Sequence, residues 1–494
     1  MKINDIFKEN IGKAFFIIGL LILVYMILSP LTNVFIHPDE FFTLGMIKFS
    51  FSDILTATSI DTHPPGHYYI LKIFLTALDM LHISYDVLFV TKLLSIVPYV
   101  LVILVSFIKL RKEYGWFTSG MFIFAIGVMS GFYFQFLTVR MYNWGLLFLL
   151  MSFIYFKDII NDSSIKSWVL FSLFTAAVFY THYFICFSSA LIYLSLFGYL
   201  FIFCRDKLIQ ELKKFIGSIV LIILLYAPWF SYFITQMSLK RPPHNIPPVD
   251  LGGLLSSSIY FITGNEIFMI KVLAVLFTIF LIVLIFKEYC CEPNAENYYV
   301  CCGFFIFFGT ILISAIVSQI YEPILLSRYL IPAASVIWLS ISILIGKINN
   351  NRLFIISMIF LVIFGFLGFA GILSDTPSLY KYGMECQSMF DEINSDPNAI
   401  IIFDGGAGIL DFKPCIDIKS YSPPISTIFG VKNYTSHKIF DFEEKSPEEL
   451  EFMANYSHNK TYYIDAWGSF ELNNTNLEKV GQIASAKFYL VDGN

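Results

Sequence analysis

Charged residues are scarce in this chain of 494 residues. Asp, Glu, Lys and Arg together make up 14% of it, whereas soluble domains carry roughly a quarter. Hydrophobic residues make up 57% and aromatic residues 18%, and several runs reach the ~20 apolar residues that a helix needs to cross a bilayer core. The scarcity of charge excludes an ordinary soluble protein and predicts an α-helical polytopic membrane protein.

Sequence patterns of several other classes are missing as well. The eight cysteines show no CxxC spacing for a metal site. There is no basic stripe of the kind that nucleic-acid binding requires, so we expect no nucleic acid as a partner. The glycine-rich segment 405–408 lacks the GxGxxG pattern and is interpreted as a turn rather than a phosphate-binding loop.

Basic residues occur in clusters between the hydrophobic runs. The clusters are Lys2/Lys8/Lys13, Lys109/Arg111/Lys112, Lys157/Lys166, Arg205/Lys207/Lys213/Lys214, Lys287 and Lys347/Arg352. The positive-inside rule places all of them in the cytoplasm. Segment 66–81 is short and carries two charges, and a crossing there would put the cluster around Arg111 outside. We therefore interpret it as an amphipathic helix on the outer interface.

The remaining hydrophobic runs predict eleven transmembrane helices in the plasma (inner) membrane, with the N-terminus inside and the C-terminus outside. They cover residues 14–34, 87–109, 117–137, 141–156, 168–182, 184–203, 215–236, 266–286, 299–320, 329–346 and 353–373. The first outside loop then covers residues 35–86. We expect residues 1–373 to form the membrane domain.

Residues 374–494 differ in charge from the rest of the chain. They contain 9 Lys and Arg against 18 Asp and Glu, a net charge of −9, while the remainder has a net charge of +4. Strand-like runs occur at 398–403, 461–465 and 488–491, and helix-like runs at 382–393 and 447–453. The pattern predicts a small soluble α/β domain on the extracytoplasmic side.

The informative polar residues fall at outward ends of the predicted spans. Asp39-Glu40 follows the first span, and the same loop continues as Asp61-Thr62-His63-Pro64-Pro65-Gly66-His67. Arg140-Met141-Tyr142, Thr181-His182-Tyr183 and Arg328-Tyr329 lie at later span ends. This topology brings polar groups from distant parts of the sequence to one face of the membrane, which favours an enzyme working at that interface.

An acidic pair followed by a His-Pro-Pro turn in the first outside loop resembles one group of membrane enzymes. These are the GT-C glycosyltransferases that use polyprenyl-phosphate sugars, in particular the protein O-mannosyltransferase and aminoarabinose-transferase families. Segment 135–142 is similar to the Arg-aromatic region that contacts the donor phosphate in this group, and Arg328-Tyr329 to its late basic-aromatic element. The resemblance implies transfer of a sugar to a protein or glycolipid acceptor in the cell envelope.

Transfer from a polyprenyl phosphate requires a carboxylate that takes the acceptor proton and cations that stabilise the departing phosphate. Asp39 is the expected base, with Glu40 beside it, although an acidic cap at a span end is the simpler interpretation of the pair. Arg140 and Arg328 are expected to hold the phosphate, although an arginine there can also reach lipid headgroups.

Further residues are assigned to the phosphate and to the substrate cavity. His182 and His63 are candidate phosphate contacts, and plain hydrogen bonds at the bilayer edge are the alternative. Substrate-cavity residues are expected to be Asp61, His67, Tyr142, Tyr183 and Tyr329. The oxygens and nitrogens of Asp39, Glu40, Asp61 and His63 could also bind a divalent ion such as Mg, Mn or Zn.

Two other functions remain to be compared with glycosyl transfer. A transporter would place charges at the bilayer midplane and often shows repeats, and the sequence has neither feature. A polyprenyl-linked oligosaccharide polymerase or ligase also faces outward, but such enzymes depend on a long central loop with arginine and histidine. The acidic pair in the first loop favours the transferase.

Overall fold

The structure is a computed structural model of the chain. It describes residues 5–32, 38–59, 61–128, 132–238, 246, 248–263, 267–291, 293–395, 400–404, 438–442, 461–465, 477–483 and 486–491. They belong to two compact units. The first comprises Met1–Ser29, Asp61–His67 and Lys92–Asp375, and the second comprises Pro30–Ile60, Tyr68–Thr91 and Thr376–Asn494.

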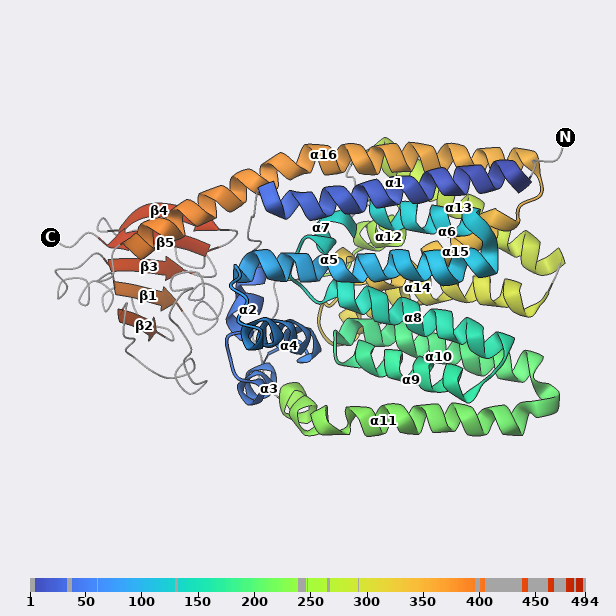
Figure 1. Ribbon diagram of the computed structural model, residues 1–494, viewed down its shortest axis with the longest axis horizontal. Coiled ribbons are helices and arrows are strands. Elements are labelled where there is room, and N and C mark those ends of the chain that lie inside the picture. Colours follow the sequence, from blue (N-terminus) through green and yellow to red (C-terminus); the bar gives the residue numbers. More distant parts are fainter. Residues whose placement is uncertain are drawn as a thin grey trace. The chain divides into compact units, whose positions relative to one another are not determined.

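The first unit is a bundle of long helices (Figure 1). Its elements, some of which extend into the second unit, are α1 (Asp5–Thr32), α5 (Val87–Val105), η1 (Ser106–Leu110), α6 (Arg111–Val128), α7 (Phe132–Phe136), α8 (Tyr142–Asn161), α9 (Ile165–Phe179), α10 (Tyr183–Phe203), η2 (Arg205–Lys207), α11 (Leu208–Ser238), α12 (Leu251–Ile259), α13 (Phe268–Cys291), α14 (Ala295–Ile320), η3 (Ser327–Leu330), α15 (Ile331–Lys347) and α16 (Asn351–Ser395).

Within the described residues, nine helical stretches are long and apolar enough to cross a membrane. One of them, Val87–Val128, contains a hairpin, because Gly115 has non-helical angles of φ 84° and ψ 177°. The Ser106 hydroxyl on one arm donates to the Ser119 carbonyl on the other at 3.1 Å. Dividing this stretch and adding the shorter apolar helix Ile165–Phe179 gives the eleven predicted helices. The chain is an integral membrane protein.

The boundaries of two predicted spans are wrong. The first helix begins at Asp5, nine residues before the predicted start at 14, since its polar first turn continues the helix. The predicted span 117–137 consists of α6, which ends at Val128, and the separate short helix α7. The segment 66–81 does form a helix, α4 (Gly66–Met80), and is not among the membrane-crossing stretches.

Burial separates central helices from lipid-facing helices in the bundle. In the stretch that contains α15, 89% of the most apolar 18-residue segment is buried inside the protein. In the stretch that contains α11, the buried share is 17%. α15 packs on α6, α8 and α14, and its buried Trp338 donates to the Phe261 carbonyl at 2.6 Å. α11 packs on α9 and α10 and runs along one side of the bundle (Figure 1).

The second unit contains α2 (Pro38–Met46), α3 (Phe51–Ser59), most of α4 and a five-stranded sheet. The strands are β1 (Ile400–Asp404), β2 (Lys438–Phe442), β3 (Thr461–Asp465), β4 (Leu477–Ile483) and β5 (Ala486–Val491), in the order β2-β1-β3-β5-β4. β1 pairs in parallel with β2 and β3, and β5 pairs antiparallel with β3 and β4.

The sheet confirms the three predicted strands and adds two that the sequence patterns missed. β2 and β4 are rich in charged and polar residues, so neither reads as a buried strand. The predicted helix at 382–393 is the last part of α16, which continues without a break from its apolar half. The predicted helix at 447–453 and the turn at 405–408 lie outside the described residues.

Candidate functional site

Arg140 lies in the short turn between α7 and α8 and is 7% exposed. Two buried side chains donate hydrogen bonds to the backbone of this turn. Lys92 of α5 donates to the Leu137 carbonyl at 2.9 Å. The Asn143 amide donates to the Gln135 carbonyl at 2.7 Å. Because the carbonyls at the end of α7 have partners from outside the helix, the backbone that presents Arg140 is held in place.

His182 is the N-cap of α10 and has an extended backbone, with φ −163° and ψ 127°. Its Nδ1 accepts a hydrogen bond from the Phe184 N–H at 3.1 Å. A neutral imidazole that accepts at Nδ1 carries its proton on Nε2. That Nε2 is buried and has no hydrogen-bond partner among the described residues. A buried N–H donor without a partner costs ~1–3 kcal/mol, which a bound acceptor would recover.

The His182 ring is surrounded by rings from three other segments. Its centroid lies 4.7 Å from Tyr329, 5.3 Å from His63 and 5.6 Å from Tyr142. Tyr142 and Tyr329 are themselves 5.7 Å apart. The loop 61–67, the start of α8, the cap of α10 and η3 therefore meet at one place, although more than 260 residues separate the first from the last.

The loop 61–67 is fixed against the end of α9. The Gly66 N–H donates to the Tyr180 carbonyl at 2.8 Å. A Cβ atom on Gly66 would lie 2.3 Å from the Tyr180 carbonyl oxygen, so only glycine fits. Pro64 and Pro65 are buried just before it, and their fixed φ angles restrict the loop further.

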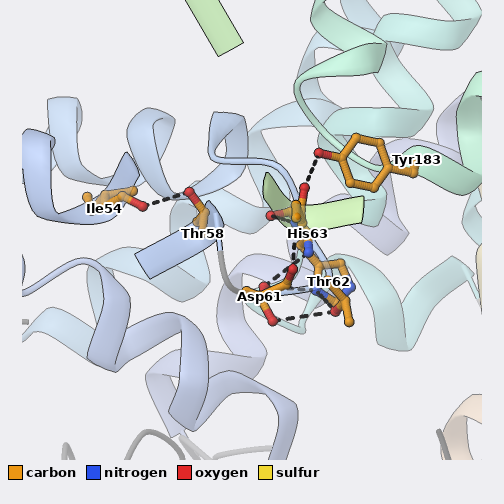
Figure 2. Close-up of polar contacts among 7 residues, drawn as sticks. Ile54, Thr58, Asp61, Thr62, His63 and Tyr183 are labelled. Atoms are coloured by element: carbon orange, nitrogen blue, oxygen red, sulfur yellow. Dashed lines mark hydrogen bonds and ion pairs between the residues drawn. The ribbon is translucent and has the colours of Figure 1, made fainter. Parts of the chain in front are cut away.

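Asp61 and His63 form a local polar pair, with the Asp61 carboxylate turned toward the His63 ring in Figure 2. The carboxylate accepts from the His63 backbone N–H at 3.1 Å, and the His63 Nδ1 lies 3.3 Å from it. The Thr62 hydroxyl lies 2.8 Å from the same ring nitrogen. Burial raises the pKa of Asp61, but the hydrogen bonds and charge of His63 outweigh it, so the pKa is lowered overall.

Positive charge dominates the surroundings of the two buried imidazoles. Burial lowers the pKa of His182 well below its usual value, and His63, Arg140 and Arg328 lower it further. Burial lowers the pKa of His67 to about 3, with Arg140 as the next cause. Both rings are therefore neutral at pH 7, with the charge of Arg140 acting on both and that of Arg328 on His182. A concentration of cations around neutral donors is suited to a bound anion.

The structure brings most of the predicted site residues together in the first unit. This group consists of Asp61, His63, His67, Arg140, Tyr142, His182, Tyr183, Arg328 and Tyr329. Asp39 and Glu40 belong to the first turn of α2 in the second unit. Glu40 is fully buried, and the side chain of Asp39 lies outside the described residues. The role of this pair stays a prediction.

The predicted divalent ion also stays a prediction. The described residues contain no group of three or more His, Cys, Asp and Glu side chains arranged to hold a metal. Of the four predicted ligands, Asp61 and His63 contact each other. The Asp61 carboxylate accepts from the His63 backbone N–H, and the His63 Nδ1 lies 3.3 Å from it.

Four buried polar residues around the site were not predicted. They are Lys92, Asn143, Trp229 and Gln236, with exposed fractions of 2% or less. Each stands inside a strongly apolar run, where a single polar residue is the only signal. A lone polar residue in a membrane helix indicates a specific partner, and this rule would have singled them out.

Two solved structures resemble this one over nearly the whole chain. ArnT from Cupriavidus metallidurans in the apo state aligns with a TM-score of 0.58 and 9% identity, covering 97% of both chains. The same protein bound to undecaprenyl phosphate aligns with a TM-score of 0.59 and 10% identity, again covering 97% of both chains. The chain has the GT-C fold.

This GT-C fold confirms the fold that the resemblance to the aminoarabinose transferases implied. No family model matches the sequence, and a search of curated proteins finds no match. Because proteins of one fold can differ in function, the function has to be argued from the GT-C site itself.

Proposed function

We propose that the protein transfers one sugar from a polyprenyl monophosphate to an acceptor on the extracytoplasmic side of the inner membrane. One observation carries this proposal: Arg140 and Arg328 converge on His182, whose Nε2 has no partner among the described residues. ArnT, which shares the fold, binds undecaprenyl phosphate, and this supports a polyprenyl phosphate as the donor lipid. The acceptor is a protein or a glycolipid.

In the proposed reaction the leaving group is the polyprenyl phosphate. The acceptor hydroxyl attacks the anomeric carbon, and Asp39 takes the hydroxyl proton, with Glu40 as the alternative base. A new bond forms between the acceptor oxygen and the anomeric carbon. The bond from that carbon to the phosphate oxygen breaks, and its electron pair stays on the phosphate. Attack opposite to the leaving group inverts the anomeric centre.

Four side chains of the site stabilise the charge that develops on the phosphate. Arg140 and Arg328 offer planar, permanently charged donors that can bind two phosphate oxygens each. The neutral His182 offers the Nε2–H, which has no partner within the described part of the chain. His63, beside the His182 ring at 5.3 Å between centroids, is the fourth contact. The interactions of these groups with the phosphate are strongest when the phosphate carries its full charge. They therefore stabilise mainly the transition state.

A transfer assay tests the proposal. Purified protein receives a synthetic polyprenyl monophosphate sugar, and mass spectrometry follows the acceptor. Addition of a single sugar is expected, and addition of many would indicate the polymerase instead. Asp39→Asn keeps the shape of the side chain but cannot take a proton, so kcat should fall by ~10²–10⁴. Normal turnover of Asp39→Asn together with a large loss in Glu40→Gln would make Glu40 the base.

Outer-surface glycans provide an independent readout in cells. Deleting the gene should remove one glycan modification, and the wild-type gene should restore it. The Asp39→Asn gene should not restore it. An unchanged set of glycans in the deletion strain would contradict the proposal.

A further inference from the structure

Gln236 near the C-terminal end of α11 links this helix to the loop that carries His63. The side chain is 1% exposed. Its amide nitrogen donates to the Asp61 carbonyl at 2.6 Å and lies 3.3 Å from the His63 carbonyl. Both carbonyls can only accept, so the orientation of the amide is determined by its partners.

The amide oxygen of Gln236 has a partner from a second segment. The Tyr183 hydroxyl donates to it, and the indole N–H of Trp229 donates to that hydroxyl at 2.9 Å. Figure 2 shows the Tyr183 hydroxyl pointing toward the segment of Asp61 and His63. Trp229, Tyr183 and Gln236 therefore form one directed chain of hydrogen bonds that ends on the backbone of the loop.

The chain of hydrogen bonds joins the two histidine-bearing segments. Tyr183 is the residue directly after His182, and the Gln236 amide holds the carbonyls of Asp61 and His63. On the other side of His182, the Tyr180 hydroxyl donates to the Leu225 carbonyl of α11 at 2.9 Å. α11 thus holds the α9–α10 turn on both sides of His182, and it reaches the His63 loop through Gln236 alone among these contacts.

We infer that Gln236 is a positioning residue that keeps the His63 loop beside the His182 cap and so shapes the donor-phosphate site. This inference rests on the proposed function, since it gives the two histidines a common ligand. Gln236 contacts the backbone of the loop and does not act on the substrate. Its effect is geometric, because the two rings that it holds in register are only 5.3 Å apart.

Two substitutions separate this role from simple packing. Gln236→Leu removes both the donor and the acceptor. Gln236→Glu keeps the length of the side chain and the acceptor for Tyr183, but turns an oxygen toward two carbonyl oxygens. The control is Gln319→Leu, because the exposed Gln319 at the end of α14 also donates to a carbonyl, that of Val249, at 3.0 Å. Gln319 lies outside the chain of bonds around Gln236.

Sugar transfer from the polyprenyl monophosphate donor is the first measurement. Misplacing a contact by about 1 Å can cost ~10²-fold, so both Gln236 variants should lose about 10–100-fold in kcat/KM for the donor. The acceptor KM and the activity of Gln319→Leu should stay within about twofold. If wild type is active, Arg140→Ala is inactive and both Gln236 variants are normal, the proposed function stands and the inference about Gln236 is overturned.

Hydrogen exchange of the protein in detergent tests whether Gln236 positions the His63 loop, and it needs no active sugar donor. Both Gln236 variants should speed amide exchange in the peptide that covers 61–69, because the loop loses its link to α11. Gln319→Leu should leave this peptide unchanged. Unchanged exchange in both Gln236 variants would overturn the inference. An inactive wild type with faster exchange in these variants would reject the proposed function and keep the structural role of Gln236.

Discussion

The two ends of the helix bundle differ in how their positively charged side chains are paired. At the end predicted to face the cytoplasm, which we call the lysine end, each of three lysines has a carboxylate partner. Lys109 binds Asp158 at 2.6 Å, and the pairs Lys214–Glu211 and Lys347–Glu296 are each 2.8 Å apart. At the other end, the site end, His63, Arg140 and Arg328 lower the pKa of His182 through their charge, and of these His63 has the Asp61 carboxylate 3.3 Å away.

The direction of the helices places these two groups apart. α8 begins two residues after Arg140 and carries Asp158 near its last turn, and α15 begins just after Arg328 and ends at Lys347. A helix of this length spans roughly 25–30 Å. The difference indicates two kinds of positive charge. At the lysine end these three lysines are neutralised within the protein and stabilise the fold, whereas the site end concentrates charge where a substrate anion would lie.

Replacing an arginine at the site end should have the largest effect. Arg140→Ala removes a permanent charge and its planar donors from the phosphate, so kcat/KM for the donor should fall by ~10²–10³. Arg140→Lys keeps the charge and should remain partly active. Lys347→Ala, at the lysine end, should change the same constant by less than about twofold. Steady-state kinetics decide, and normal transfer by Arg140→Ala would reduce this residue to a headgroup anchor.

Gly66→Ala tests whether the geometry of the site end is as tight as the structure indicates. The new Cβ would lie 2.3 Å from the Tyr180 carbonyl oxygen, so the loop with His63 has to shift. A shift of this size should lower kcat by about tenfold or more. The control is Gly217→Ala on α11, where a Cβ meets no atom within 4 Å. Equal activity of the two variants would show that the loop position does not matter.

Asp158→Asn tests the structural role of the lysine end. The side chains of Lys109 and Asp158 are 32% and 17% exposed, so the pair is partly screened by solvent. Losing the carboxylate leaves Lys109 half-buried without its partner and should lower the free energy of unfolding by ~1–2 kcal/mol. Thermal unfolding in detergent measures this loss. The donor kcat/KM should be unchanged, and a large kinetic defect would contradict the division of roles between the ends.

The pH dependence of stability tests the burial of a neutral His67. His67 has a pKa of about 3 in the folded protein and ~6.5 when unfolded. Between these values the unfolded chain binds more protons, so stability rises with pH from about 3 to 6.5 and is lost as pH falls. His67→Gln should reduce this slope by up to one proton, or ~1.4 kcal/mol per pH unit. An unchanged slope in thermal unfolding would contradict the burial of a neutral His67.

Sequence patterns predicted the bundle and one part of its site for clear physical reasons. Apolar runs and basic loops indicate spans and their direction, and a charged residue such as Arg140 at an outward span end is costly without a partner. Lys92 and Gln236 stand out in the sequence as polar residues in apolar runs, but the sequence does not say what they contact, because their partners are backbone carbonyls of distant segments. Gln236 and Asp61 are 175 residues apart, and no local pattern encodes a contact between them. The strands β2 and β4 were missed because charged and polar residues interrupt their apolar residues.

Binding of free undecaprenyl phosphate is the most direct test of the central claim, that the site end holds the donor phosphate. Isothermal titration would compare wild type with two double variants in the same detergent at the same ionic strength. Arg140→Ala/Arg328→Ala should bind at least ~100-fold more weakly, since it removes two charge-assisted contacts. Lys109→Ala/Lys347→Ala removes as much charge at the lysine end and should bind like wild type. Equal affinity in all three proteins, or an equal loss in both double variants, would contradict the account.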